Sequence, residues 1–208
     1  MRGVTARQHL QHLEAALRDL HGDVERIDRW GAHVAEVLIT GGRLLAAGNG
    51  GSAAHAQHLT AELVGRYLDE RRPLSAIALH ADTSSVTAIV NDYGADEVFA
   101  RQVRAHGRPG DVLLALSTSG RSVNVLAAVS AAHELGMTVY AFTGRAPCPL
   151  AGAADDALCV DGDTPTIQEV HQVAVHLLCA AIDSEVLANE SSPAVVEPFR
   201  AIVVGRSS

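Results

Sequence analysis

The chain has 208 residues, 48% of them hydrophobic, which favours one ordered domain with a single core over a disordered chain. Its formal net charge is -8 and no run of Lys or Arg stands out, which argues against a nucleic-acid or anionic-membrane partner. Three scattered cysteines without a CxxC pair favour reduced thiols, and no apolar run approaches about 18 residues. With no signal-peptide pattern at the start, we expect a cytoplasmic protein with no membrane partner.

Apolar residues near the N-terminus predict an amphipathic helix with Thr5 as its N-cap. They recur at alternating spacings of three and four, at Leu10, Leu13, Leu17, Leu20, Val24 and Ile27. We expect this stripe to pack on the core or to form a coiled-coil-like contact with another subunit. Gly22 interrupts the run.

From residue 43 onward, short apolar runs alternate with helix-like stretches. The predicted strands are 44–47, 76–79, 112–116, 138–142 and a weaker 157–160. The predicted helices are 52–67, 94–106, 122–135 and 166–187. This order predicts a doubly wound α/β fold whose five-stranded parallel sheet is covered on both faces. We place one domain, N-terminal helices included, at 1–188 and a C-terminal tail at 189–208.

The first predicted strand leads into a Gly-rich turn and a helix, in the segment LLAAGNGGSAAHAQHL. Glycine lets a ligand approach the backbone, and the helix that Ser52 opens adds free N–H groups that attract anions. Gly48-x-Gly50-x-x-Ala53 satisfies the relaxed dinucleotide fingerprint. The acidic residue that NAD binding needs should follow by about 20 residues, whereas Asp82 lies about 30 residues on, so NAD is disfavoured.

A second strand–loop–helix junction, VLLALSTSGRSVNVLAAV, carries a hydroxyl-rich turn. Ser117, Thr118, Ser119 and Ser122 offer O–H donors, and Gly120 frees the backbone to do the same. One such loop often marks only a turn or a helix cap. Two of them at the carboxyl ends of strands face the crevice where ligands of α/β sheets bind, which favours a phosphorylated ligand.

Two predicted helices carry histidines at spacings that share a face. His58 and Glu62 are four residues apart, and Gln168 and His176 are eight apart with His171 between them. Such a pair is common by chance, but two helices can bring their pairs to one site, within a subunit or across subunits. Nitrogen and oxygen donors suit zinc or another divalent transition metal better than magnesium.

Four segments resemble the phosphoheptose isomerases of the sugar-isomerase (SIS) domain superfamily: GNGGSAAHAQHLTAELVGRY, VNDYG, STSGRSVNV and IQEVHQVAVH. The resemblance spans about residues 5 to 187 and implies a flavodoxin-like SIS domain. It implies an aldose–ketose isomerase that converts sedoheptulose 7-phosphate to D-glycero-D-manno-heptose 7-phosphate through an enediol, toward nucleotide-activated heptose. It also implies a homotetramer with one zinc ion per subunit and active sites between subunits.

The resemblance assigns roles residue by residue. The family's metal and catalytic positions fall on His58, Glu62, Gln168 and His176, with Glu62 and His176 catalytic. Its substrate-binding positions fall on Asn49, Gly50, Gly51, Ser52, Glu62, Asn91, Asp92, Ser117, Thr118, Ser119, Ser122 and Gln168. The chain departs from the common pattern at Ala47, where family members often have Cys, and at Ala61, where many have Glu.

Two alternatives stay open from sequence. One is a non-enzymatic SIS protein that binds the bacterial replication initiator, since such proteins keep the Gly loop and the strand motifs. The known example lacks Glu and His at the positions of Glu62 and His176, and this chain has both. The other alternative is an isomerase of a different sugar phosphate.

Overall fold

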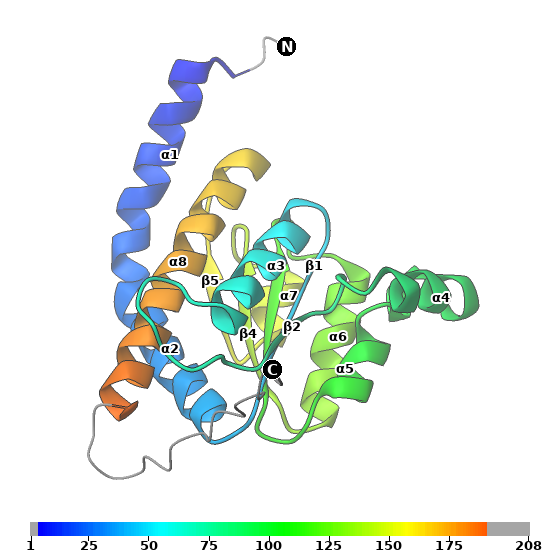
Figure 1. Ribbon diagram of the computed structural model, residues 1–208. Coiled ribbons are helices and arrows are strands. Elements are labelled where there is room, and N and C mark those ends of the chain that lie inside the picture. The colour runs from blue at the N-terminus through cyan, green and yellow to red at the C-terminus, as the bar shows by residue number, and fades with distance from the viewer. Residues whose placement is uncertain (1–3, 191–208) are drawn as a thin grey trace, which may run out of the picture.

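The computed structural model describes residues 4–190, and its centre is a parallel sheet between two helical layers (Figure 1). The strands are β1 (Leu44–Gly48), β2 (Ala76–Ala78), β3 (Val112–Ser117), β4 (Thr138–Thr143) and β5 (Asp156–Cys159). Their order is β2-β1-β3-β4-β5 and every pairing is parallel, which confirms the predicted doubly wound fold. Every residue of β1 and β3 is buried, as a sheet covered on both faces requires.

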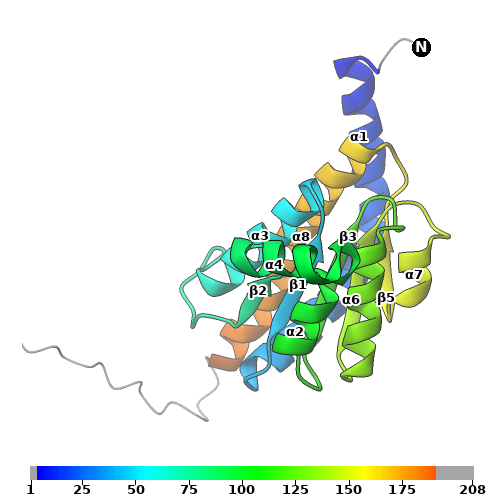
Figure 2. The same ribbon diagram turned by 90° about the vertical axis from the view of Figure 1, so that its right-hand side faces the viewer.

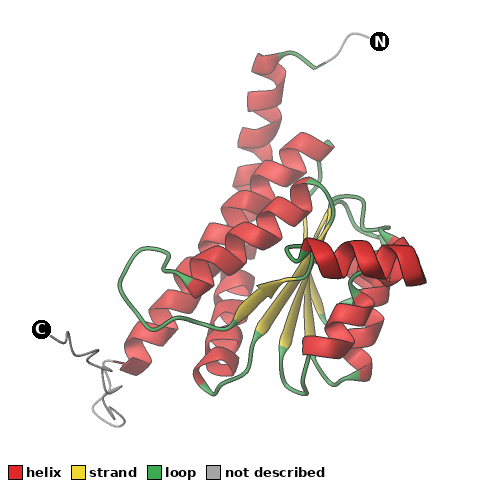
Figure 3. Cartoon of the chain, turned by 45° about the vertical axis from the view of Figure 1, so that its right-hand side comes forward, coloured by secondary structure: helices red, strands yellow, loops and turns green. Residues whose placement is uncertain are grey.

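Alternate strand residues build two apolar cores, one on each face of the sheet. Helices cover both faces (Figure 3). Leu44 and Leu114 join the first core, while their neighbours Leu45 and Leu113 join the second. The first layer consists of α1 (Ala6–Leu20), α2 (Val24–Ile39), α3 (Gly51–Val64) and α8 (Thr164–Glu190). The second is built on α5 (Ala100–His106), α6 (Val123–Glu134) and α7 (Pro149–Ala153).

The N-terminal stripe does not lie on one continuous helix. Thr5 caps α1 as predicted, but α1 ends at Leu20, a 3₁₀ turn spans His21–Asp23 at Gly22, and α2 continues from Val24. Leu20 and Ile27 are buried in the core, whereas Leu10 is 58% exposed. The first turns of α1 extend beyond the body of the domain (Figures 1 and 2). The inner part of the stripe therefore packs on the core, and its outer end is free in one chain.

Two helices were not predicted, and one was predicted too long. The segment 94–106 begins as a 3₁₀ turn, Ala95–Glu97, before α5. The short helix α7 and the helix α4 (Thr83–Tyr93) were not predicted; α4 has no fully buried residue, although its Val86 and Ile89 pack on the second core. Asp82 is the N-cap of α4, because its carboxylate accepts hydrogen bonds from the N–H groups of Ser84 and Ser85. This gives Asp82 a structural role in place of the ribose contact of a dinucleotide site.

The last helix, α8, is the longest in the described part of the chain. By length and mean hydropathy alone α8 could cross a membrane, but half of its most apolar window is buried inside the domain. Eight hydrophobic residues from Ile167 to Val186 belong to the first core, so α8 is a core helix. It ends at Glu190, two residues inside the predicted tail, whose remaining residues 191–208 lie outside the described part of the chain.

Candidate functional site

The two predicted loops lie side by side at the carboxyl edge of the sheet. Gly48 of β1 pairs with Leu116 of β3, so the turns that follow both strands open at the same place. Gly50 is the N-cap of α3 with φ 55°, and Ser122 is the N-cap of α6. No side chain caps either helix, so both N-termini keep N–H groups for an anion.

The hydroxyls of the second loop cluster as the sequence predicts. The Oγ atom of Ser117 lies 2.9 Å from that of Ser122 and 3.4 Å from that of Ser119. Ser119 Oγ also accepts a hydrogen bond from the N–H of Arg121. The Thr143 hydroxyl donates to the Ser117 carbonyl at 3.0 Å and anchors the loop to β4. Three hydroxyls thus gather at one helix N-terminus.

The first loop is bounded by two amide side chains from other elements. Asn49 and Asn124 exchange two hydrogen bonds of 2.9 and 3.0 Å, which ties the loop to α6. Gln168 of α8 covers Gly51 so closely that a Cβ at Gly51 would collide with its amide group. Ser52 is buried behind the turn. Asn124 was not predicted, although it lies in the STSGRSVNV segment.

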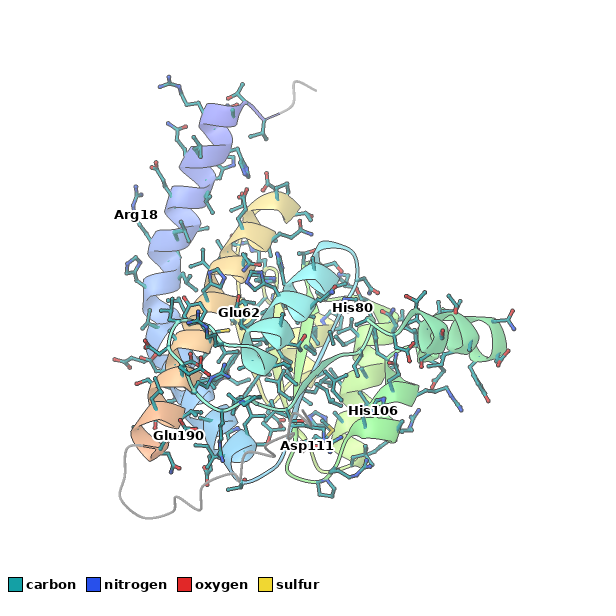
Figure 4. The ribbon with its side chains drawn as sticks, in the orientation of Figure 1. Arg18, Glu62, His80, His106, Asp111 and Glu190 are labelled. Atoms are coloured by element: carbon teal, nitrogen blue, oxygen red, sulfur yellow. The ribbon has the colours of Figure 1, made fainter. Side chains whose placement is uncertain are left out.

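His58, Glu62 and His176 form a cluster where α3 and α8 meet. Glu62 lies between these two helices in Figure 4. His58 Nε2 is 3.0 Å from Glu62 Oε1 and 3.2 Å from His176 Nε2. One ligand atom from each of the three residues lies within 4.8 Å of the other two. The first predicted pair, His58 and Glu62, therefore meets His176 of the second pair within a single chain.

The donor set of this cluster fits a divalent transition metal. Ligand bonds of about 2.0–2.2 Å in a tetrahedral zinc site place neighbouring donor atoms about 3.3 Å apart. The distances of 3.0 and 3.2 Å in the cluster are close to that value. His176 Nε2 has two neighbours at 3.2 Å, His58 Nε2 and Gln172 Nε2, but one ring nitrogen offers only one proton or one lone pair.

Gln172 contacts the cluster directly, through His176 at 3.2 Å. Gln172 lies four residues before His176 on the same helix face, a spacing that could have identified it from sequence. Gln168 lies one turn earlier still, against the Gly51 loop. In this structure Gln168 therefore joins the first loop, and the cluster has three protein donors that are histidine or carboxylate.

Two further side chains, Tyr67 and His171, lie near the cluster or on the same helix as His176. The Tyr67 ring lies 5.6 Å from that of His176, and burial, together with nearby acidic groups, raises the pKa of Tyr67. His171 also belongs to α8 but points into the core: it is fully buried, and its Nε2 is 3.2 Å from the Thr143 carbonyl. Burial lowers the pKa of His171 to about 4, so this histidine is neutral at pH 7.

Asn91 and Asp92 lie apart from both loops. They belong to α4, which stands out from the body on the side away from α1 (Figure 1). Both side chains are exposed, and the Asn91 amide donates to the Asp92 carboxylate at 2.7 Å. Within one chain, the predicted substrate-binding set therefore divides into the two loops, the cluster and this exposed pair.

Comparison with known proteins places the chain in a class and then in a family. The fold with its two loop-to-helix junctions is that of a SIS domain, and the family model for the SIS domain matches residues 8–144. Over 177 residues the chain is 63% identical to the phosphoheptose isomerase of Streptomyces coelicolor, covering 85% of this chain and 77% of that protein. The chain belongs to the phosphoheptose isomerase family.

Two solved structures agree with that assignment. A phosphoheptose isomerase from Francisella tularensis superimposes with a TM-score of 0.81 at 37% identity, covering 86% of this chain and 96% of that one. The phosphoheptose isomerase from Neisseria gonorrhoeae gives a TM-score of 0.75 at 43% identity, covering 86% and 94%. The relatives at this level of identity are isomerases, which favours an enzyme over an initiator-binding protein.

Proposed function

We propose that this protein is an aldose–ketose isomerase that converts sedoheptulose 7-phosphate to D-glycero-D-manno-heptose 7-phosphate. The observation that carries the proposal is the convergence of His58, Glu62 and His176 from two helices into one half-buried cluster. The high identity to a phosphoheptose isomerase supports the choice of substrate. The product would enter the synthesis of nucleotide-activated heptose.

The reaction moves one proton between C1 and C2 and another between O1 and O2. Glu62 is the proposed base at carbon, because a carboxylate takes a proton and returns it to the neighbouring carbon of the enediol. Its side chain is 24% exposed and turned toward α8, so it is accessible yet shielded. His176 is the proposed proton carrier at the oxygens or in ring opening. Groups positioned in this way contribute about 10²–10⁴-fold in rate.

His58, Glu62 and His176 would hold the metal. The family resemblance also suggests Gln168 as a fourth ligand, and its side chain would have to leave its contact with Gly51 to reach the metal. A bound zinc ion would supply Lewis-acid stabilisation of negative charge at the substrate oxygens. Glu62 cannot be a tight ligand and a free base at the same moment, so we propose that it alternates between these roles. The Gln172 amide can donate to His176 Nε2 only while that nitrogen is not bound to the metal.

The loops at the sheet edge would bind the rest of the substrate. Ser117, Thr118, Ser119 and Ser122 would hold the phosphate at the N-terminus of α6, where the helix dipole favours an anion. Asn49, Gly50, Gly51, Ser52 and Gln168 would contact the sugar at the neighbouring loop. Such local contacts suit a protein whose net charge is -8 and whose sequence has no run of Lys or Arg.

We also propose that the enzyme is a cytoplasmic homotetramer with active sites between subunits. Asn91 and Asp92 lie on α4, apart from both loops and from the cluster within one chain. A neighbouring subunit would bring such a pair to the loops, and the exposed end of α1 offers an apolar contact for it.

The test is to incubate metal-loaded protein with sedoheptulose 7-phosphate and to follow the products by NMR. The proposal expects an aldose 7-phosphate with exchange of one carbon-bound proton for solvent deuterium. An unchanged ketose after prolonged incubation would contradict it and favour the initiator-binding alternative. Turnover of other ketose phosphates at a higher kcat/KM would assign the enzyme to a different sugar.

A further inference from the structure

Arg71 is a buried arginine that no part of the proposed site uses. It belongs to the irregular segment that follows α3, and its side chain is 0% exposed. One guanidinium nitrogen, Nη2, donates to the Glu62 carbonyl at 2.8 Å. The other, Nη1, donates to the Leu63 carbonyl at 2.9 Å and the Gly65 carbonyl at 3.2 Å. Arg71 thus donates to carbonyls at and just beyond the end of α3, of which that of Leu63 also accepts from the N–H of Leu74.

The third nitrogen of the same guanidinium reaches the other helix of the cluster. Arg71 Nε donates to Asp183 Oδ1 at 2.8 Å, and the Asp183 side chain is only 7% exposed. Asp183 lies seven residues after His176, two turns along α8 on nearly the same face. One side chain therefore joins the turn of α3 that carries Glu62 to the part of α8 that carries His176.

Cys179 lies on α8 between His176 and Asp183. It is fully buried, and burial, followed by the charges of Glu62 and Asp183, raises its pKa to about 12, while Arg71 opposes the rise. The same segment also holds Tyr67, whose ring faces His176. A planar fork with five N–H donors can serve several carbonyls and a carboxylate at once, whereas the single ammonium of lysine cannot.

We propose that Arg71 and Asp183 are positioning residues that fix the distance and rotation of α3 relative to α8. This pair, here called the Arg71–Asp183 clamp, holds Glu62 and His176 where proton transfer and metal binding need them. The inference rests on the proposed roles of Glu62 and His176. Buried ion pairs often add little net stability compared with apolar residues of similar volume, so their effect on geometry can be separated from their effect on folding.

The test replaces both partners, as Arg71→Met with Asp183→Leu. The double variant leaves no unpaired buried charge, so it should fold, but the carbonyl of Glu62 loses its donor. We expect kcat per folded site to fall about 10- to 100-fold, since a displacement of about 1 Å at a reacting group costs up to about 10²-fold. KM should stay within about twofold, because the phosphate loops are untouched. Zinc affinity, measured by chelator competition without substrate, should fall about 10-fold or more.

Two further variants separate positioning from stability. Asp111→Asn alters a buried carboxylate at the amino-terminal edge of the sheet, away from the two loops (Figure 4). This carboxylate accepts hydrogen bonds from the backbone N–H groups of Arg43 and Arg108. It should lower the unfolding temperature and leave kcat per folded site and zinc affinity unchanged. Arg71→Lys keeps the charge opposite Asp183 but not the fork, and should lose kcat as the double variant does.

The outcomes distinguish the clamp from the proposed function. A folded double variant with wild-type kcat and zinc affinity, measured beside an inactive Glu62→Gln variant, overturns the clamp alone. Full turnover in Glu62→Gln overturns the proposed role of Glu62 and the clamp with it. A lowered kcat at unchanged KM in the double variant, with wild-type values in Asp111→Asn, supports the clamp.

Discussion

The buried histidine His171 predicts a specific loss of stability in acid. Its pKa is about 4 in the folded chain and 6.5 in the reference state, so the unfolded chain binds more protons between these values. Stability must therefore fall as pH decreases from about 6.5 toward 4. A difference of about 2.5 pKa units corresponds to about 3 kcal/mol lost between pH 7 and pH 4. About 2 kcal/mol of this should already be lost at pH 5.

The change that isolates this effect is His171→Gln, since a glutamine amide can still donate to the Thr143 carbonyl that His171 contacts. Urea unfolding at several pH values between 7 and 4 gives the free energy of unfolding of both proteins. The wild type should lose about 3 kcal/mol more than the variant across this range. Replacing exposed His12 with Gln is the matched control and should keep the wild-type pH dependence. Equal slopes for wild type and His171→Gln would refute the reasoning.

Three more predictions concern the loops and the surface. Ser119→Ala should raise KM about 10- to 100-fold with little change in kcat, because losing a hydrogen bond to a charged group costs about 1.5–3 kcal/mol; steady-state kinetics with an unchanged KM would place the phosphate elsewhere. Leu10→Asp with Val173→Asp puts charge on two apolar positions that are exposed in one chain, so light scattering should report a smaller assembly than for the wild type. A double variant with the wild-type mass would contradict a role of these positions in assembly. Gly51→Ala forces a methyl group against the Gln168 amide, so the free energy of unfolding should fall by about 1 kcal/mol and KM should rise. Thermal unfolding and steady-state kinetics that both give wild-type values would contradict the contact.

The sheet could be predicted from sequence because its strands are short continuous apolar runs bounded by glycines and polar turns. All five observed strands overlap predicted ones. The helix α4 was missed although Val86, Ile89, Val90 and Tyr93 recur at helical spacing, because the stripe is short and none of its residues is fully buried. The break at Gly22 could be located from sequence, but whether the helix would resume in the same direction depends on packing against α8.

The functional site, too, could be predicted only in part from the sequence. The spacing of His58 and Glu62 predicted a shared helix face, and the resemblance predicted that His176 would join them. Convergence within one chain depends on how α3 crosses α8, which is a tertiary property that no local pattern contains. The Arg71–Asp183 clamp was missed because its two residues are 112 positions apart in sequence. Gln172 was missed although it lies four residues before His176, because the resemblance assigned the amide role to Gln168.

The central claim is that Glu62 and His176 carry the isomerisation, and one comparison tests it most directly. Wild type, Glu62→Gln and His176→Ala are assayed for turnover of sedoheptulose 7-phosphate, with bound metal measured by elemental analysis on the same samples. We expect the folded Glu62→Gln variant to lose at least about 10²-fold in kcat, and His176→Ala to lose activity together with bound zinc. Wild-type turnover in both variants would contradict the proposed mechanism and leave only the fold and the family in place.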